Sequence, residues 1–267
     1  MQRWRDGRLT EADDFVAEEV AVALIYNGTP YTVMLVTPAD LEDFATGFSL
    51  SESIVAEAGQ ITLREMRRLA NGVELWLKIP GECYRLLLQR GRSMAGRTGC
   101  GLCGSNSLDD AIRPPVAVAG GCTVSSVALV RAVAQIQQRQ TLNQITGAVH
   151  GAAWADVGGE ILLVREDVGR HNALDKLIGA LARQGVDLHA GFAVITSRAS
   201  FEMVQKSATA GIAILAAISA PTGLAVRMAQ SCGLTLVGFA RGGNYNVYAH
   251  PQRLMYPGQS LVANSAE

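Results

Sequence analysis

The sequence predicts an α/β fold in which helices cover both faces of a mainly parallel sheet. Three continuous apolar runs, 191–195, 212–217 and 234–239, are separated by helical segments that begin near Ser200 and Thr222. Buried parallel strands are typically unbroken apolar runs because both of their faces are covered, and the crossover between two of them is usually a helix. This alternation places such a sheet in the C-terminal half of the chain.

Composition limits the classes of function. The chain has 267 residues, enough for one large or two modest domains, and its net charge is −1. That charge gives no argument for binding nucleic acid or a membrane surface. Charged residues make up 18% of the chain, below the roughly 25% of an average domain. A surface with so few charges hints at a buried subunit interface.

Cysteine usage and the chain ends indicate the compartment. Five cysteines, an odd number, and an N-terminus without an apolar signal segment favour a cytoplasmic protein over a secreted disulfide scaffold. The uncharged segment 207–226 is long enough to resemble a membrane span. Because Pro221 and two glycines interrupt it, we expect it to divide into a strand, a turn and a helix of the buried core.

Strand and helix signals alternate in the N-terminal third. Residues 15–36 are typical of two strands around the turn 27–30. Thr37 is suited to the N-cap of a helix, because apolar residues from Leu41 onward follow at helical spacing. The elements expected next are strands over 61–69 and 73–79 and a short helix over 82–90.

A glycine-rich stretch, 91–121, is the best candidate for a linker. After it, Thr123 is expected to cap a helix that carries Val127, Val130 and Ala134 on one face. The elements expected after that helix are a hairpin over 148–164 and a helix that begins after Arg170.

Polar and small residues follow each predicted strand of the C-terminal sheet. In an open α/β sheet, ligands collect just beyond the carboxyl ends of the strands. Four arginines fall there and are expected to converge on one rim: Arg165, Arg170, Arg198 and Arg241. Helix N-termini at the same edge offer free N–H groups and a positive dipole. The sequence therefore predicts a phosphorylated or otherwise anionic ligand.

The segment 98–104, TGCGLCG, holds two thiols, Cys100 and Cys103, in a glycine-rich loop. A structural zinc site needs four ligands, and no second Cys or His pair stands at a suitable spacing. A thioredoxin-like redox pair opens a helix, whereas glycines flank this pair on both sides. Persulfide chemistry fits best, because a reactive thiolate accepts a sulfane sulfur and a neighbouring thiol holds or releases it. Zinc binding and redox exchange stay open as alternatives.

Zinc deaminases of the cytidine type also contain a Cys-x-x-Cys pair. They need a His-x-Glu segment first and Pro-Cys-x-x-Cys later, with the glutamate moving protons. Here His150 is followed by Gly151 and Ala152, so the glutamate is absent, and the cysteine pair precedes the histidine. Deaminase catalysis is therefore disfavoured.

A second dense polar cluster covers 166–176. One interpretation is a capped helix with a solvated face, since charges in a first helical turn are ordinary. The functional interpretation places Arg170, His171 and Asn172 at the start of a helix, where they grip a phosphate or a purine edge. Further along, Lys206 and Glu202 stand one helical turn apart, a spacing typical of an exposed ion pair.

Three motifs together resemble the formate dehydrogenase accessory sulfurtransferase family, of the FdhD type. They are TGCGLCG at 98–104, REDVGRHNALDK at 165–176 and FARGGN at 239–244. The order of the motifs also matches, and the resemblance spans nearly the whole chain. The middle motif is highly specific, whereas the cysteine loop alone is not.

The resemblance implies a fold and a set of boundaries. It implies a small N-terminal α+β domain over 1–95 and a mobile Cys-x-x-Cys loop and linker over 96–121. The remaining part, 122–267, is implied to be a cytidine-deaminase-like three-layer α/β domain that binds the cofactor. The family is usually dimeric, so a homodimer is expected.

The resemblance also implies a sulfur carrier in molybdenum cofactor maturation. A cysteine desulfurase would pass sulfane sulfur to Cys100 as a persulfide, with Cys103 as the partner thiol. The sulfur would then go to bis-molybdopterin guanine dinucleotide, for which a guanine nucleotide can substitute, before insertion into the formate dehydrogenase catalytic subunit. The residues implied to contact this cofactor are Phe239, Ala240, Arg241, Gly242, Gly243 and Asn244, to which the predicted rim adds Arg170, His171, Asn172 and Arg198. No resident metal is expected.

A hypothesis from another class is a cofactor-binding chaperone without obligatory sulfur transfer. In that case the α/β domain would hold the guanine dinucleotide, and the cysteines would only dock or protect it. The activity of formate dehydrogenase in cells that carry a variant without Cys100 and Cys103 separates the two.

Overall fold

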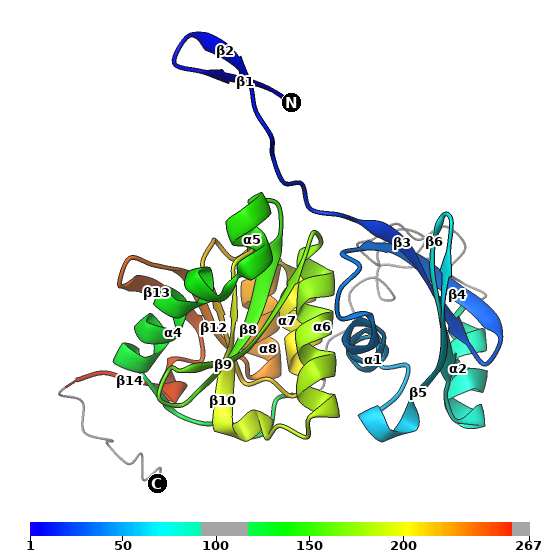
Figure 1. Ribbon diagram of the computed structural model, residues 1–267. Helices are drawn as coiled ribbons and strands as arrows, with labels where there is room; N and C mark the ends of the chain where they lie inside the picture. The colour runs from blue at the N-terminus through cyan, green and yellow to red at the C-terminus, as the bar shows by residue number, and fades with distance from the viewer. Residues whose placement is uncertain (92–116, 258–267) are drawn as a thin grey trace, which may run out of the picture.

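The computed structural model describes residues 1–91 and 117–257, which form two units that each contain a sheet (Figure 1). Cys100 and Cys103 lie outside the described residues, as does most of the predicted loop and linker. The boundary predicted between 95 and 96 also falls there, so the domain limits stay predictions.

The N-terminal unit is a four-stranded sheet with two helices. The strands stand in the order β4-β3-β6-β5, and β3 and β6 are parallel. Their bounds are β3 Val20–Tyr26, β4 Thr29–Val36, β5 Thr62–Leu69 and β6 Gly72–Lys78, and the helices are α1 Leu41–Ser51 and α2 Gly81–Gly91. All six elements lie where the sequence predicts them, and residues of both helices pack into the core of this sheet. A separate hairpin, β1 Gln2–Arg5 and β2 Arg8–Glu11, precedes them and projects away from the body (Figure 1).

The C-terminal unit is built on a six-stranded sheet in the order β13-β12-β11-β10-β8-β9. Its strands are β8 His150–Asp156, β9 Ile161–Asp167, β10 Gly191–Ile195, β11 Ile214–Ala217, β12 Thr235–Arg241 and β13 Asn244–Ala249. The helices are α4 Ser126–Arg139, α5 Thr141–Thr146, α6 Arg170–Arg183, α7 Phe201–Thr209 and α8 Gly223–Cys232. A short pair, β7 Val124–Ser125 and β14 Leu254–Met255, joins the ends of the unit.

This unit has three layers, and the predicted α/β class is confirmed. One core lies between the sheet and α6, α7 and α8, and a second lies between the sheet and α4 on the other face (Figure 1). The sheet is mixed: β10, β11 and β12 run parallel, whereas β8 and β13 run antiparallel to their neighbours. Strands β8 and β13 are antiparallel because a tight turn joins β8 to β9 and another joins β12 to β13, and strands joined in this way pair antiparallel.

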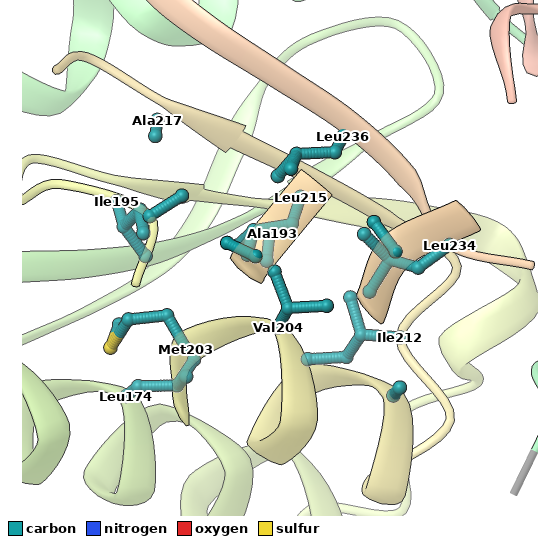
Figure 2. Packing of buried hydrophobic residues seen from close by; sticks show 14 of the residues in the cluster. Leu174, Ala193, Ile195, Met203, Val204, Ile212, Leu215, Ala217, Leu234 and Leu236 are labelled. Atoms are coloured by element: carbon teal, nitrogen blue, oxygen red, sulfur yellow. The ribbon is translucent and has the colours of Figure 1, made fainter. Parts of the chain in front are cut away.

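The uncharged segment 207–226 is buried core, as expected. It divides into the end of α7, strand β11 and the start of α8. Figure 2 shows Leu215 of β11 among Ala193, Val204 and Leu236, with apolar side chains on every side. Among the described residues, no helix combines the length and the apolar character needed to cross a membrane.

Two predicted helix starts were wrong. Asp40, not Thr37, is the N-cap of α1, and Ser125, not Thr123, caps α4 by accepting a hydrogen bond from the Ala128 N–H. Thr37 does not cap α1, because its groups bond elsewhere. Its N–H donates to Asp167, its hydroxyl accepts from the Val168 N–H, and its carbonyl oxygen accepts from Lys176.

The two units meet where α1 crosses α6 (Figure 1). Both helices carry a glycine at the crossing, Gly47 on α1 and Gly179 on α6. A Cβ atom on Gly47 would lie 1.7 Å from the Asp175 carbonyl oxygen, and one on Gly179 would lie 1.9 Å from the Asp43 carbonyl oxygen. Only hydrogen at both positions permits so close an approach of two helix backbones.

Candidate functional site

The rim of the six-stranded sheet collects the predicted site residues. Strands β9, β10, β11 and β12 all end at this edge. Strand β8 runs the other way, so its first residue, His150, lies opposite Asp167 at the end of β9. The rim therefore combines the ends of four strands, the starts of β8 and β13, and the N-termini of α6, α7 and α8.

Much of the segment 165–176 points into the protein and not toward the rim. Asp167 and Lys176 are both fully buried, with 2.7 Å between Lys176 Nζ and Asp167 Oδ2. The Thr37 N–H donates to the same carboxylate (2.9 Å), and Lys176 donates to the Thr37 carbonyl oxygen (2.9 Å). Burial lowers the pKa of Lys176, and Asp167 opposes that shift. These groups join the N-terminal unit to the sheet of the C-terminal unit.

Asn172 belongs to the same buried network. Its side-chain NH₂ donates to the Leu35 carbonyl oxygen (2.8 Å) and to Asp167 Oδ1 (2.9 Å), and the residue is 4% exposed. The structure therefore gives Asn172 a structural position and no support as a ligand contact. The interpretation of 166–176 as a helix with a solvated face was wrong for these residues, although a helix does begin at Arg170.

A second buried network is centred on Asp175, the residue of α6 next to Lys176. Ser51 of α1 donates to Asp175 (2.6 Å), and Lys206 of α7 lies 3.0 Å from Asp175 and 2.9 Å from Glu52. Burial alone would lower the pKa of Lys206, but the two carboxylates outweigh it and raise that pKa. Lys206 does not form the exposed pair with Glu202 that the spacing predicted, because it points into the interface between the two units. We name this interface, where α1 packs against α6 and α7, the seam.

Arg165 is likewise turned away from the rim. It donates to Asp43 of α1, with 2.9 Å between Arg165 Nε and Asp43 Oδ2. The neighbouring Glu166 carboxylate accepts hydrogen bonds from the Leu142 and Asn143 N–H groups at the start of α5 (both 2.9 Å). The prediction that four arginines converge on one rim was therefore wrong for Arg165.

Arg170 and His171 do stand at the rim, in the first turn of α6. His171 Nε2 lies 3.7 Å from Glu202 Oε2 at the start of α7, and Arg170 Nε is buried without a hydrogen-bond partner among the described residues. We name His150, Arg170, His171 and Glu202 the histidine patch. Arg198, in the loop between β10 and α7, is exposed.

The charge states in the histidine patch differ from those of free side chains. Partial burial would raise the pKa of Glu202, but His171, Ser200 and a backbone N–H outweigh it and lower the pKa to about 2. Partial burial, together with Arg170 and His171, lowers the pKa of His150. At neutral pH the patch therefore holds an anionic glutamate, a neutral His150 and the positive Arg170.

The turn between β12 and β13, 239–244, forms the other part of the rim. Phe239 has a left-handed backbone (φ 53°) at an irregularity in the β12–β13 pairing and is 39% exposed. Gly242 and Gly243 are also left-handed, as this tight turn requires. Arg241 and Asn244 are exposed, whereas the Ala240 side chain is buried in the core. Ala240 as a whole is 1% exposed, so the structure gives it a position in the core.

A cavity of about 250 Å³ lies between this turn and helix α4. We name 239–244 the turn patch. Strand β12 is two strand positions from β10 and four from β9. At about 4.8 Å per position, the turn patch lies about 10–19 Å from the histidine patch along the rim. One phosphate does not reach both patches, but an elongated ligand does.

Three cysteines are described, and all three are free thiols: Cys83, Cys122 and Cys232. Burial raises the pKa of Cys122 and of Cys232, so neither is a ready nucleophile. Among the described residues, no three His, Cys, Asp or Glu side chains are grouped so that they could hold a metal ion.

The FdhD/NarQ family model matches residues 17–255. The chain belongs to the FdhD/NarQ family. Proteins named sulfur carrier protein FdhD from Cupriavidus necator and Xanthomonas euvesicatoria are 53% and 52% identical to it, over 256 and 254 residues. These alignments cover 96% and 95% of this chain, and 89% and 90% of the two relatives. The predicted family resemblance is thereby confirmed.

A solved structure shares the fold of this FdhD/NarQ chain. It is a protein from Desulfotalea psychrophila described as a formate dehydrogenase accessory protein, with a TM-score of 0.73 and 24% identity. The match covers 96% of this chain and 97% of that one. The arrangement of both units is therefore a known architecture.

Sequence reasoning missed two residues of the histidine patch, His150 and Glu202. Their signals were present, since His150 begins a strand and Glu202 follows the carboxyl end of β10. Their proximity to Arg170 and His171 depends on the order of the strands, which places β8 beside both β9 and β10. The individual roles of the predicted site residues stay predictions.

Proposed function

We propose that this protein is a sulfur carrier that accepts sulfane sulfur from a cysteine desulfurase. It delivers the sulfur to bis-molybdopterin guanine dinucleotide before the cofactor enters formate dehydrogenase. The names of its relatives support sulfur carriage, and the description of the structural neighbour supports the connection to formate dehydrogenase. The observation that carries the cofactor assignment is a rim with two separated patches that each hold an arginine, Arg170 and Arg241, which suits a long ligand with several phosphates.

The sulfur-accepting step assigns Cys100 as nucleophile. Its thiolate attacks the outer sulfur of the persulfide on the desulfurase, and a new S–S bond forms on Cys100. The S–S bond of the donor breaks, and the donor cysteine leaves as a thiolate, so no external oxidant or reductant is needed. Cys103 is the partner thiol that holds or releases the sulfur.

The rim residues fit the nucleotide part of the cargo. Arg170 has a buried Nε that no other described residue pairs with, and the first turns of α6 and α7 lack a side-chain cap, so their N–H groups are suited to phosphate. Arg241 offers a second guanidinium at the turn patch. The bound cofactor supplies the molybdenum that receives the sulfur.

Mass spectrometry tests the sulfur-accepting step. After incubation with a cysteine desulfurase and cysteine, we expect added sulfur on the peptide that contains Cys100. A Cys122→Ala variant, which removes a half-buried thiol, is the control and should load fully. Full loading of a Cys100→Ala/Cys103→Ala variant would refute the role of the pair.

Calorimetry with guanosine diphosphate tests the cofactor assignment. Arg170→Ala and Arg241→Ala should each weaken binding about tenfold, as expected for the loss of a charge-assisted contact. Arg64→Ala changes an exposed arginine on β5, in the sheet of the N-terminal unit, and serves as the control. Unchanged affinity in both rim variants removes the assignment.

The alternative function, a cofactor-binding chaperone, shares the rim but not the sulfur chemistry. Cells that carry the Cys100→Ala/Cys103→Ala variant should lose formate dehydrogenase activity if sulfur transfer is required. Retained activity favours the chaperone.

We also propose a homodimer, for which sedimentation velocity should give about twice the chain mass of 28.3 kDa.

A further inference from the structure

The N-terminal hairpin, β1 and β2, has an apolar face that is exposed to solvent. Its turn contains Asp6 and Gly7 with φ values of 51° and 78°, typical of the tight turn that joins two antiparallel strands. Trp4 and Leu9 stand opposite each other across the pair and are 70% and 59% exposed. A two-stranded hairpin is marginally stable in water by itself. This hairpin would therefore be stabilised by a surface that covers Trp4 and Leu9.

The opposite face of the N-terminal hairpin is basic. Side chains alternate between the two faces of a strand, so Arg3, Arg5 and Arg8 point away from Trp4. Residues 12–19, which contain no helix or strand, connect the hairpin to β3. A segment of this length spans at most about 26–29 Å, long enough for the hairpin to reach a neighbouring molecule. The surface that suits it best is an apolar recess with negative charge nearby.

A cleft of about 750 Å³ lies beside the seam, between the two units, and we name it the seam cleft. Its volume falls within the 300–1,000 Å³ typical of binding pockets. Its apolar lining comes from both units, with Ile54, Val55 and Leu86 from the N-terminal unit and Ile178 and Leu181 from α6. These side chains suit the apolar face of the N-terminal hairpin, and the volume has room for a large aromatic side chain.

The charge at the seam cleft is opposite to that of the arginines. Glu52 and Glu57 line the cleft, whereas no lysine or arginine in the described part of the chain does. Lys206 bonds to Glu52 (2.9 Å) but also to Asp175 (3.0 Å), so one ammonium group serves two carboxylates. Complementary charges steer two surfaces together and fix their orientation. The arginines of the N-terminal hairpin are therefore attracted to this cleft.

The position of the hairpin favours the cleft of a second copy over its own. Val20, where the connecting segment ends, pairs with Val36, which precedes α1, whereas the seam cleft is lined from Leu50 onward, at the other end of α1. Figure 1 shows the N-terminal hairpin pointing away from the body of its own chain and from α2, whose Leu86 lines the cleft. Two copies that exchange hairpins reciprocally form a closed two-fold dimer.

We propose that the N-terminal hairpin of one copy docks in the seam cleft of a second copy, with Trp4 and Leu9 against its apolar lining. This inference goes beyond sulfur transfer and adds to the proposed homodimer the contact that joins the two copies. Because the exchange is reciprocal, the apolar faces of both hairpins are covered in the dimer.

Cross-linking tests the contact directly, because Cys83 is a free thiol that lines the seam cleft. In the Cys100→Ala/Cys103→Ala background, Leu9→Cys treated with a bis-maleimide should give a covalent dimer in which peptide mapping joins residues 9 and 83. Thr10→Cys, on the other face of the hairpin, should give at least about tenfold less of the corresponding link. Absence of the 9–83 link, its restriction to single chains, or equal yields from the two variants overturns the proposal.

Sedimentation velocity gives a second readout that needs no cross-link. Trp4→Ser removes the largest apolar side chain of the hairpin and should raise the dissociation constant of the dimer at least about tenfold. Phe15→Ser is the matched control, since Phe15 is 72% exposed but lies outside the hairpin, and it should stay within about twofold of wild type. Equal dissociation constants for Trp4→Ser and wild type contradict the proposal.

Sulfur loading separates this inference from the proposed function. Trp4→Ser should load sulfur on Cys100 as wild type does, because the hairpin takes no part in the thiol chemistry. A wild-type protein that stays monomeric in sedimentation contradicts both the hairpin contact and the homodimer, and it leaves the sulfur-carrier function intact.

Discussion

Charged residues between 165 and 206 divide into two groups by the partners they meet. Asp167, Asp175, Lys176 and Lys206 are buried at the seam between the two units and bond to one another or to α1 and its preceding loop. Arg170 and Glu202, by contrast, reach the rim. A single signature motif thus contributes both to the assembly of the two units and to the candidate site, and mutations within it should separate into two classes.

Loss of the seam lysine should destabilise the protein strongly. Lys176→Ala leaves the Asp167 carboxylate buried without its partner, and removal of one member of a buried pair typically costs about 3–5 kcal/mol. Arg67→Ala is the matched control, because its pair with Glu65 is exposed to solvent and its loss should change the free energy of unfolding far less. Urea unfolding measures both free energies. Equal losses in the two variants would show that the buried pair does not join the units.

Glu202 makes the stability of the histidine patch depend on pH. Its pKa is about 2 in the folded protein against 4.5 for the free side chain, so its contribution is present above about pH 4.5. That contribution is lost as the pH falls through about 2. Glu202→Gln should therefore be less stable than wild type at pH 7, by at least about 1 kcal/mol after allowance for solvent.

Urea unfolding between pH 7 and pH 3 measures the difference between wild type and Glu202→Gln. We expect the difference to shrink steadily below about pH 4.5. Glu18→Gln, at an exposed position before β3, provides the control for simple loss of a surface charge. A difference that does not vary with pH contradicts the role of the carboxylate.

At the scale of the element, periodicity predicted the existence of helices better than their faces. The apolar residues of α4 form two neighbouring stripes along the helix. One contains Leu129 and Val133, and the other contains Val130 and Ala134. Hydrophobicity alone does not choose between them. The choice depends on the packing of Ala128, Leu129 and Ile136 against β8, β10 and β12, which only the folded sheet defines.

The crossing of α1 and α6 depends on two glycines that no pattern in the sequence singled out. Gly47→Ala would place a methyl group 1.7 Å from the Asp175 carbonyl oxygen, so the helices must move apart. We expect a loss of about 3 kcal/mol or more, at the upper end for overpacking, because backbone atoms and not side chains must give way. Gly59→Ala is the control, since no atom lies within 4 Å of the position that its methyl group would occupy. Thermal melting compares the two, and similar melting temperatures would contradict the crossing.

For the whole molecule, the sequence indicated the fold class and the family, but not which of the site residues lie close together. The apolar runs predicted β10, β11 and β12 correctly, because continuous runs separated by helices are typical of a parallel sheet covered on both faces. The rim was predicted as one cluster of arginines. It is instead two patches, because strand order and the turning of Arg165 toward Asp43 separate the guanidinium groups. Neither feature leaves a signal in a single sequence.

Contacts across the seam predict that the two units unfold together. Thr37 bonds to Asp167, and Ser51 bonds to Asp175, in addition to the glycine crossing of α1 and α6. If one unit unfolded alone, the other would keep buried charges without partners, which is strongly unfavourable. A single cooperative transition is therefore expected, although proteins larger than about 150 residues often show intermediates.

Differential scanning calorimetry should give a ratio of van't Hoff to calorimetric enthalpy close to one for the wild-type protein. In Gly47→Ala, where the seam is forced open, the ratio should fall, because the four-stranded and six-stranded sheets then unfold with less coupling. Gly59→Ala should keep the wild-type ratio. Two resolved transitions in the wild type would mean that the contacts at the seam do not couple the unfolding of one unit to the unfolding of the other.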